Sequence, residues 1–262
     1  MPLLHVINPL YALSGLIVGM LVGFTGVGGG SLMTPLLVLA FGVNPATAVG
    51  TDLLYAGLTK ISGSAVHAFH GAVDWRMTRR LAYGSVPAAA LSLLLLAHLG
   101  TASEASGGVI TTTLGFALMM TAATLIFRKA LLSRLARLLD GVSERTIGLL
   151  TVVLGAVLGV LVTISSVGAG AIGATVLITL YPRSPIVRIV GSDIAHAVPL
   201  TLIAGAGHWW IGSVDGLMLL SLLTGSIPGI MIGSHYASRV PDKVLRPIMA
   251  GTLAIVGGRL AF

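Results

Sequence analysis

The sequence predicts an all-α polytopic membrane protein made of two inverted-topology repeats, each a broken, re-entrant helix hairpin plus three transmembrane helices. Of the 262 residues, 55% are hydrophobic and only 9% are charged, whereas about a quarter of the residues in a soluble domain are charged. Long apolar stretches recur along the chain, and glycine clusters interrupt two of them. The absence of cysteine excludes disulfides, thiolate catalysis and cysteine-ligated metal sites.

Six apolar stretches are long enough for a complete membrane helix, which needs about 20 residues. They are residues 45–70, 76–99, 107–127, 186–211, 216–236 and 244–262. Two further stretches, 9–42 and 146–182, are too long for one span, and small residues interrupt both. Because glycine is about 1 kcal/mol less favourable than alanine inside a helix, we expect each of these stretches to break into two short helices.

The two broken stretches belong to an internal repeat. A shift of 140 or 141 residues superposes identical or similar residues in the same order. The matched pairs include Gly15 with Gly155, Gly28 with Gly168, Gly50-Thr51-Asp52 with Gly191-Ser192-Asp193, His67 with His208, and Asp74 with Asp215. The chain therefore reads as a duplicated unit, with a first repeat at 1–127, a connector at 128–145 and a second repeat at 146–262.

The placement of basic residues predicts the orientation of the repeats. If each broken stretch crossed the membrane once, the repeats would be parallel and the loop Lys and Arg residues would be split eight to five between the two faces. If each stretch is instead a re-entrant hairpin, the second repeat is inverted and all thirteen lie on one face. The positive-inside rule favours the second arrangement, with basic loops in the cytoplasm and both termini outside the cell (inner) membrane.

The interrupted segments predict an anion site. Irregular backbone at membrane depth is tolerated where protein or a water-filled cavity satisfies its polar groups, and the free N–H groups at a helix N-terminus attract anions. The expected substrate-binding residues are Thr25, Gly28, Gly29, Gly30, Ser31, Ser165, Ser166, Gly168, Ala169 and Gly170. The alternative is that the glycines only permit close helix packing, which accounts for scattered glycines better than for clustered ones.

Four ionisable residues inside the spans are candidates for coupling ion movement. Asp52 and Asp193 lie about 12 Å deep at 1.5 Å per residue. They could carry protons, since burial disfavours a charged carboxylate, or accept hydrogen bonds at the adjacent break. Lys60 could attract the anion, pair with an aspartate or extend toward water. His196 lies on the same helical face as Asp193 and could tune it.

Two further features have less specific interpretations. His67 and His208 could relay protons, although a helix-end histidine bonded to a carbonyl group is the more common case. The connector 128–145 is basic and amphipathic, and we expect it to lie along the anionic cytoplasmic leaflet.

The segments GFTGVGGGSLMTPLL, GTDL and SSVGAGAIG, together with the Val-Asp loops at 73–74 and 214–215, resemble the sulfite exporter TauE/SafE family of membrane transporters. The likeness covers nearly the whole chain. It implies a carrier of sulfite, sulfonates or related organic anions, with the family's glycine-rich positions at Gly28, Gly29, Gly30, Gly168 and Gly170. Because Ala169 replaces one glycine in the second repeat, the two half-sites need not contribute equally.

Taken together, the residues and the resemblance predict a proton-coupled secondary transporter of small sulfur-containing or organic anions. A passive anion channel would use the same helix ends. A metal-cation exporter using Asp52, Asp193, His196 and Met33 is less consistent with the sequence, as is an intramembrane enzyme, because hydrolase and zinc motifs are missing. We expect no cofactor, metal or nucleic-acid partner. The expected partners are a small anion and the lipid bilayer, and a homo-oligomer remains open.

Overall fold

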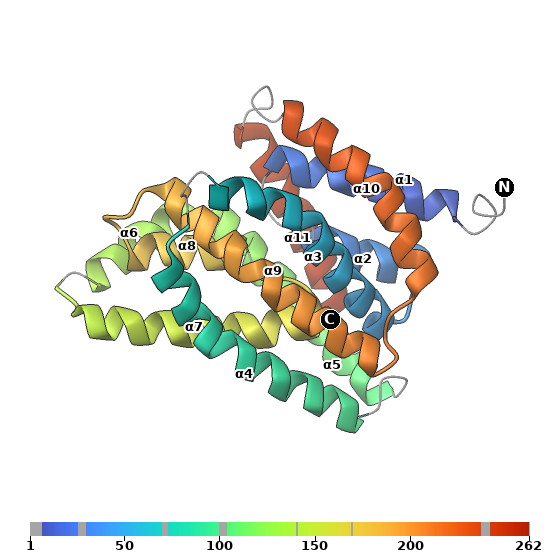
Figure 1. Cartoon of the computed structure of the whole chain (residues 1–262), viewed down its shortest axis with the longest axis horizontal. Coiled ribbons are helices and arrows are strands. Elements are labelled where there is room, and N and C mark those ends of the chain that lie inside the picture. Colours follow the sequence, from blue (N-terminus) through green and yellow to red (C-terminus); the bar gives the residue numbers. More distant parts are fainter. Residues whose placement is uncertain are drawn as a thin grey trace.

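The computed structural model describes residues 7–25, 30–69, 73–99, 104–139, 141–168, 170–236 and 242–261. Within these ranges the chain consists of helices joined by short turns, with no strand (Figure 1). The helices are α1 (Pro9–Thr25), α2 (Gly30–Phe41), α3 (Pro45–Phe69), α4 (Trp75–Leu99), α5 (Glu104–Ile126), α6 (Arg128–Leu138), α7 (Glu144–Ser165), α8 (Ala171–Leu180), α9 (Ile186–Trp210), α10 (Gly216–Tyr236) and α11 (Asp242–Ala261). The predicted all-α class is confirmed.

Several helices have the length and composition of membrane spans. In the described part of the chain, five of them are apolar enough to cross a bilayer: Trp75–Leu99, Gly107–Ile126, Glu144–Ser165, Ile186–Trp210 and Gly216–Gly233. Large apolar side chains cover their outer faces, for example Leu91 and Leu149, which are 67% and 62% exposed. Such a surface suits lipid contact and would be unfavourable in water. The protein is therefore a multi-pass membrane protein.

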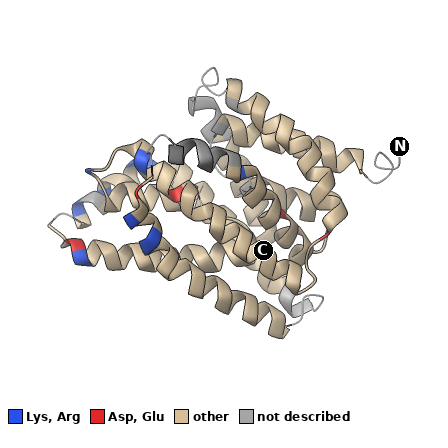
Figure 2. Ribbon diagram, viewed as in Figure 1, with Lys and Arg blue, Asp and Glu red and all other residues tan. Residues whose placement is uncertain are grey.

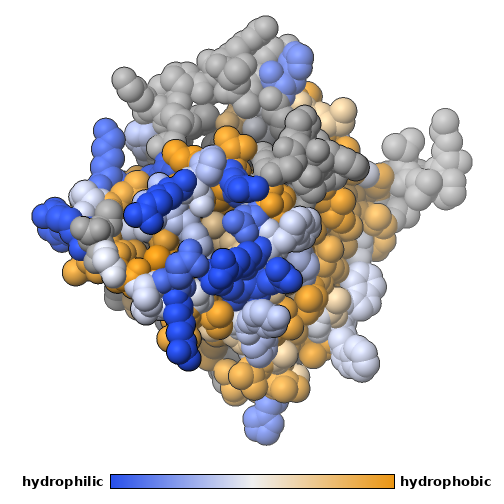
Figure 3. Space-filling view, turned by 60° about the vertical axis from the view of Figure 1, so that its left-hand side comes forward, coloured by the Kyte–Doolittle hydropathy of each residue, from blue (hydrophilic) through white to orange (hydrophobic). Residues whose placement is uncertain are grey.

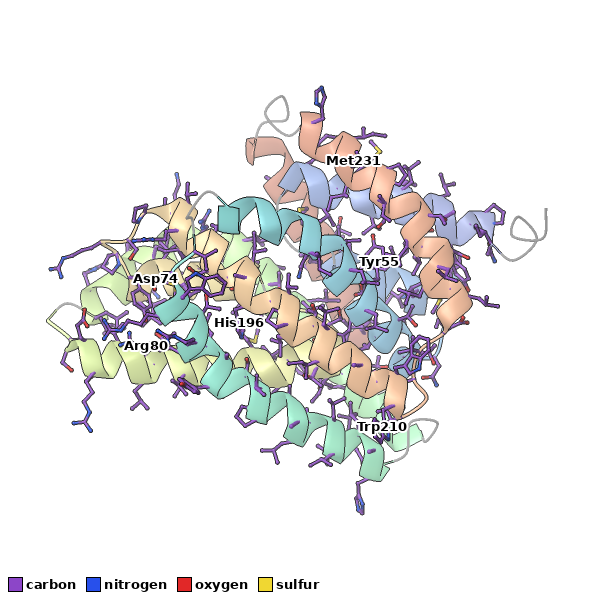
Figure 4. The ribbon with its side chains drawn as sticks, viewed as in Figure 1. Tyr55, Asp74, Arg80, His196, Trp210 and Met231 are labelled. Atoms are coloured by element: carbon purple, nitrogen blue, oxygen red, sulfur yellow. The ribbon has the colours of Figure 1, made fainter. Side chains whose placement is uncertain are left out.

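Polar groups concentrate at one end of the bundle. Figure 2 shows Lys and Arg residues gathered at the end of the bundle that contains α6 and the first turns of α4 and α7. The turned view in Figure 3 shows the same end as a hydrophilic area bordered by apolar surface. In Figure 4, Asp74 and Arg80 lie at this end and Trp210 lies at the opposite one. We call these the basic end and the Trp210 end.

Each interrupted stretch doubles back on itself. The ring of Tyr11, near the start of α1, lies 4.9 Å from the ring of Phe41 at the end of α2. In the second repeat, the hydroxyl groups of Thr151, near the start of α7, and Tyr181, just after α8, are 2.8 Å apart. A straight rod of thirty residues would separate such positions by about 45 Å. Both stretches therefore fold back as pairs of helices, α1 with α2 and α7 with α8.

The two limbs of each hairpin differ in length. Helices α1 and α7 contain 17 and 22 residues, whereas α2 and α8 contain 12 and 10. The expectation of two short helices per stretch is therefore wrong for α7. Ser143 explains its length, since its hydroxyl oxygen accepts a hydrogen bond from the N–H of Thr146 at 3.2 Å and caps the helix before the apolar stretch begins.

The two repeats pack reciprocally. Helix α1 packs against α10 and α4 against α7, while α3 pairs with α9 and α5 with α11. If the two repeats are exchanged, the contact of α1 with α10 becomes the contact of α7 with α4. The contacts of α3 with α9 and of α5 with α11 are unchanged by the exchange. Glycines make the close approach possible, because a side chain at Gly15 would collide with the backbone of Leu222, and one at Gly155 with that of the matched Leu81. These scattered glycines have the packing role that the alternative interpretation gave them.

The matched helices α3 and α9 run antiparallel. Gly50, in the first turns of α3, lies beside His208 near the end of α9, and Gly57 lies beside Thr201. The two helices cross at the centre of the molecule, with the hairpins on either side. The connector forms helix α6, which contacts α8 and α5, so it touches the short limb of the second hairpin.

Candidate functional site

Two buried aspartates occupy the central helices. Asp52 on α3 is 0% exposed and Asp193 on α9 is 2% exposed. Each follows the glycine and hydroxyl residue of its matched triplet. Charged groups are rarely enclosed in this way without a partner. The surroundings of the two carboxyl groups therefore define the site.

Asp52 is held between hydroxyl groups from both repeats. Its Oδ2 accepts a short hydrogen bond from the hydroxyl of Thr34 on α2. The side chain of Ser166, at the tip of the second hairpin, also interacts with this carboxyl group. However, neither Asp52 Oδ1 nor Ser166 Oγ has a partner in good hydrogen-bonding geometry among the described residues. Two buried oxygen atoms therefore face the site without a donor.

Asp193 lies against the first turn of α8. A side chain at Gly173 would collide with Asp193 Oδ1, so glycine is needed there for the carboxyl group to approach the helix. Helix α8 follows Gly170, whose φ is +105°, and no side chain caps it. The N–H groups of Ala171 and Ile172 consequently open the helix with no partner in a preceding turn. This helix end is positive, which favours a nearby carboxylate or a bound anion.

Lys60 links the two carboxyl groups electrostatically. It lies on α3 and interacts electrostatically with both aspartates. No ion pair within 4 Å joins Lys60 to either aspartate among the described residues, whereas Arg76 and Glu144 at the basic end form one at 3.6 Å. The position matched to Lys60 is Thr201. The site therefore has two acids related by the repeat and one base that is not.

The structure gives the two central histidines different partners. His196 Nε2 lies 2.7 Å from the hydroxyl of Ser85 on α4, and no hydrogen bond between His196 and Asp193 is found among the described residues. His208 Nε2 lies 2.9 Å from the carbonyl oxygen of Thr163 on α7, a carbonyl partner of the kind expected for a helix-end histidine. The side chain of His67 lies outside the described residues.

Only part of the predicted binding set can be placed. Thr25 ends α1, and Gly30 and Ser31 begin α2, but the side chains of Thr25 and Ser31 lie outside the described residues. So do Gly28, Gly29 and Ala169. In the second repeat, Ser165 donates its hydroxyl to the carbonyl of Leu161 within its own helix, at 2.6 Å. Ser166 and Gly168 have positive φ values of 58° and 120°, so the chain leaves the helix there.

Two hydroxyl residues next to the aspartates were missed by sequence reasoning. Thr51 Oγ1 accepts a hydrogen bond from the N–H of Asp215 at 3.1 Å, and Ser192 Oγ accepts one from the N–H of Asp74 at 2.7 Å. Each contact joins a central helix to a loop of the other repeat. The sequence did contain a signal for these contacts, because a hydroxyl residue precedes the aspartate in both matched triplets.

A shallow pocket of about 740 Å³ lies at the Trp210 end. It is lined by Trp209, Val214, Asp215, Gly216, Leu217, Leu219 and Leu220. None of the predicted site residues lines it. No group of three or more His, Asp or Glu side chains arranged for a metal ion occurs in the described ranges.

An apolar helical bundle enclosing a polar, charged centre defines the class as membrane transporters, and the comparisons agree with this. The chain belongs to the sulfite exporter TauE/SafE family, whose model matches residues 11–260. It is 38% identical over 252 residues to the probable membrane transporter protein YjnA of Bacillus subtilis, covering 95% of this chain and 97% of that one. It is 28% identical over 258 residues to the probable membrane transporter protein YdhB of the same organism, covering 94% and 97%. No solved structure shows significant similarity to the chain.

Proposed function

We propose that the protein is a secondary transporter that moves small sulfur-containing or organic anions, of the sulfite and sulfonate class, in exchange or symport with protons. Membership of the TauE/SafE family supports a transport role. The main observation behind the proposal is that the side chain of Ser166, which follows α7 in the second repeat, interacts with the carboxyl group of Asp52 in the first repeat. A ligand bound there would touch both repeats at once and could respond to their relative movement.

The anion binds at the N-terminal turns that follow the breaks. Backbone N–H groups of Ala171 and Ile172, together with the glycine segment that includes Gly28, Gly29 and Gly30, supply donors and a positive helix end. Glycine permits close approach to the backbone because it has no Cβ. Lys60 offsets the negative charge of Asp193, so that an anion does not face an uncompensated carboxylate.

Inverted repeats provide the movement. The antiparallel course of α3 and α9 and the reciprocal packing of α1 with α10 and α4 with α7 support a pseudo-two-fold relation between the halves. In transporters built from inverted repeats, one conformation opens the site to one side of the membrane. When the two repeats exchange conformations, the site opens to the other side. The basic end faces the cytoplasm, as the positive-inside rule requires.

Single cysteines test this orientation, because the natural sequence contains none. Ser133→Cys lies on the exposed face of α6, and Trp210→Cys replaces a side chain that is 91% exposed. A membrane-impermeant maleimide added to intact cells should label Trp210→Cys and spare Ser133→Cys until the membrane is permeabilised. Labelling of Ser133→Cys alone in intact cells would reverse the assigned topology.

Transport itself is measured with purified protein in proteoliposomes. Uptake of labelled sulfite should respond to an imposed pH gradient, and Gly29→Leu should abolish it by filling the backbone site. Gly251→Leu is the matched control, because a side chain at Gly251 would meet nothing within 4 Å. Sulfite flux that survives Gly29→Leu would remove the assigned anion site.

Two further measurements define the substrate and the mode of transport. A thermal-shift screen of sulfite, thiosulfate, sulfonates and small carboxylates should single out the substrate class, since a ligand that binds the native state raises apparent stability. Counterflow of labelled substrate against a trans pool separates a carrier from a channel. A passive anion channel shows no trans-stimulation.

A further inference from the structure

Five buried polar atoms between the Trp210 end and the centre lack a hydrogen-bond partner among the described residues. They are Ser213 Oγ, His208 Nδ1, Thr163 Oγ1, Ser166 Oγ and Asp52 Oδ1. The residues that carry them are between 0% and 6% exposed. Buried polar atoms without a partner are rare in native proteins, and several of them together indicate a place where water or a ligand binds.

Contacts between these residues place them in one continuous series. The backbone N–H of Ser213 donates to the carbonyl oxygen of His208 at 2.8 Å, and His208 Nε2 lies 2.9 Å from the carbonyl oxygen of Thr163. Thr163 and Ser166 are three residues apart where α7 ends, and the side chain of Ser166 interacts with Asp52. The series therefore leads from the loop after α9 to the carboxyl group of Asp52.

The hydrogen bond of His208 determines which of its ring nitrogens can receive a proton. A carbonyl oxygen can only accept, so Nε2 carries the hydrogen and donates it to Thr163. In the neutral ring Nδ1 is then an acceptor, and no donor lies near it in the described part of the chain. Nδ1 can therefore bind and release a proton while the Nε2 bond holds the ring in place. The groups that contact His208 from α3, α7 and the following loop belong to Gly50, Thr163 and Ser213, which are uncharged.

The hydroxyl group of Thr163 is not used inside its own helix. Serine and threonine hydroxyls in helices commonly donate to a carbonyl oxygen of the preceding turn, as those of Thr151 and Ser165 do in α7. Thr163 Oγ1 makes no such bond. It is therefore available to hydrogen-bond water between α7 and α9.

The outer end of the series adjoins the shallow pocket at the Trp210 end. Trp209, Val214 and Asp215 are among the residues that line this pocket, and they directly follow His208 and Ser213 in the chain. Asp215 is exposed, so a carboxylate that can exchange protons with bulk water lies at the mouth. The pocket therefore gives the buried series an entrance.

The three hydroxyl groups are present in one repeat only. The positions matched to Ser213, Thr163 and Ser166 are Ala72, Gly23 and Gly26. Asp193 Oδ1 also lacks a partner among the described residues, but the first repeat has no hydroxyl residues at these positions to connect it with the basic end. The series is therefore not a by-product of the duplication.

The carboxyl group at the inner end of the series has few ionisable neighbours. Tyr55 and Lys60, both on α3, interact with Asp52. From α2, Thr34 donates a hydrogen bond to Asp52 Oδ2. Oδ1 is therefore the oxygen that remains to exchange a proton with the series.

We propose that Ser213, His208, Thr163 and Ser166, joined by water molecules, form a path along which protons pass between the Trp210 end and Asp52. This path rests on the transport function proposed above and adds the route and the side from which the proton comes. A proton from water in the pocket binds His208 Nδ1, which gives an imidazolium, and leaves from the same atom to the next water. The hydroxyl groups of Thr163 and Ser166 each accept one proton and release another, and the Asp52 carboxylate receives the last one.

Loss of the path should abolish proton coupling and spare substrate binding. In proteoliposomes, counterflow at equal pH exchanges labelled for unlabelled sulfite without net proton release, whereas uptake driven by a pH gradient requires that release. His208→Gln keeps an N–H group for Thr163 but cannot carry a proton, so it should lose gradient-driven uptake and retain counterflow. Thr163→Val and Ser213→Ala should slow gradient-driven uptake in the same way.

Two matched variants control for the substitutions themselves. His98→Gln changes an exposed histidine near the end of α4. Thr121→Val changes a buried threonine whose hydroxyl donates to Ala117 within its own helix. Both should leave counterflow and gradient-driven uptake close to those of the natural protein.

Each outcome has a separate meaning. Unchanged gradient-driven uptake in His208→Gln would overturn the path, and so would a parallel loss of both activities in all three path variants, because a structural role predicts that loss. If His208→Gln does not elute as a folded species in size-exclusion chromatography, Thr163→Val and Ser213→Ala give the same comparison. Counterflow without any response to the pH gradient in the natural protein would refute the path and leave a carrier. Absence of both activities in the natural protein would instead refute the transport function, and the path with it.

Discussion

The hydroxyl oxygen of Ser192 accepts a hydrogen bond from the backbone N–H of Asp74 at 2.7 Å, which ties α9 to the loop before α4. Asp74 in turn caps α4, since its Oδ1 accepts hydrogen bonds from the N–H groups of Arg76 and Met77. The same arrangement recurs at Thr51 and Asp215. In each triplet, the aspartate contacts the short helix of its own repeat, α2 or α8. The hydroxyl residue before it contacts a loop of the other repeat.

Removing these hydroxyl groups should destabilise the protein. Ser192→Ala leaves the N–H of Asp74 without its acceptor, and Thr51→Val does the same at Asp215. We expect each to lower the free energy of unfolding by about 1–3 kcal/mol, measured by thermal unfolding in detergent. The swaps Ser192→Thr and Thr51→Ser keep the hydroxyl and serve as controls. Equal losses in the swaps and the deletions would contradict the hydrogen-bond explanation.

Gly155 should tolerate no large side chain. Gly155→Leu would force α7 away from the backbone of Leu81, and overpacking of this kind typically costs about 1–3 kcal/mol or more. A lower unfolding temperature is the expected result. Gly251→Leu, where a side chain has open space, should unfold close to the natural protein. Comparable destabilisation at both positions would mean that leucine is harmful for reasons other than packing.

Tyr181 should couple α4 to the second hairpin at the basic end. Its hydroxyl accepts a hydrogen bond from Arg80 Nη1 at 3.0 Å and lies 2.8 Å from the hydroxyl of Thr151. A double-mutant cycle of Tyr181→Phe and Arg80→Gln should give an interaction energy of about 0.5–3 kcal/mol. Tyr83→Phe, at a side chain that is 73% exposed, is the control. An additive cycle would show that Arg80 and Tyr181 act independently.

Gly173 should be required for the position of Asp193. In Gly173→Ala, the added methyl group would occupy space now held by Asp193 Oδ1 and displace the carboxyl group from the start of α8. We expect a loss of stability of about 1–3 kcal/mol and a fall in sulfite uptake. Gly251→Ala provides the matched control for both measurements. Unchanged uptake in Gly173→Ala would show that transport does not depend on this contact.

The sequence predicts the fold class well and the site only partly. Apolar length and glycine clusters predict a helical membrane protein, and the resemblance carried by GTDL and the glycine segments points to the family that the comparisons then show. Helix limits depend on local caps, which is why α7, capped by Ser143, begins at Glu144 and not at the expected residue 146. Contacts such as Ser192 with Asp74 join residues 118 positions apart. Hydrophobic periodicity carries no information about such a pair.

The position of Lys60 between the two repeats also escaped prediction. Lys60 lies eight residues from Asp52 along the same helix, and it also interacts electrostatically with Asp193 on α9. Only the crossing of α3 and α9 brings Lys60 and Asp193 together. The repeat did indicate an asymmetry, because Thr201 occupies the position matched to Lys60.

The exchange of partners between α1 and α10, and between α4 and α7, has a consequence for biosynthesis. When the first half of the chain has left the ribosome, α1 and α4 still lack the helices that pack against Gly15 and Gly84. Neither half can reach its mature structure by itself, and assembly waits until synthesis of α10 is complete. By the same logic, two separately expressed halves contain complementary surfaces through which they can reunite in the bilayer.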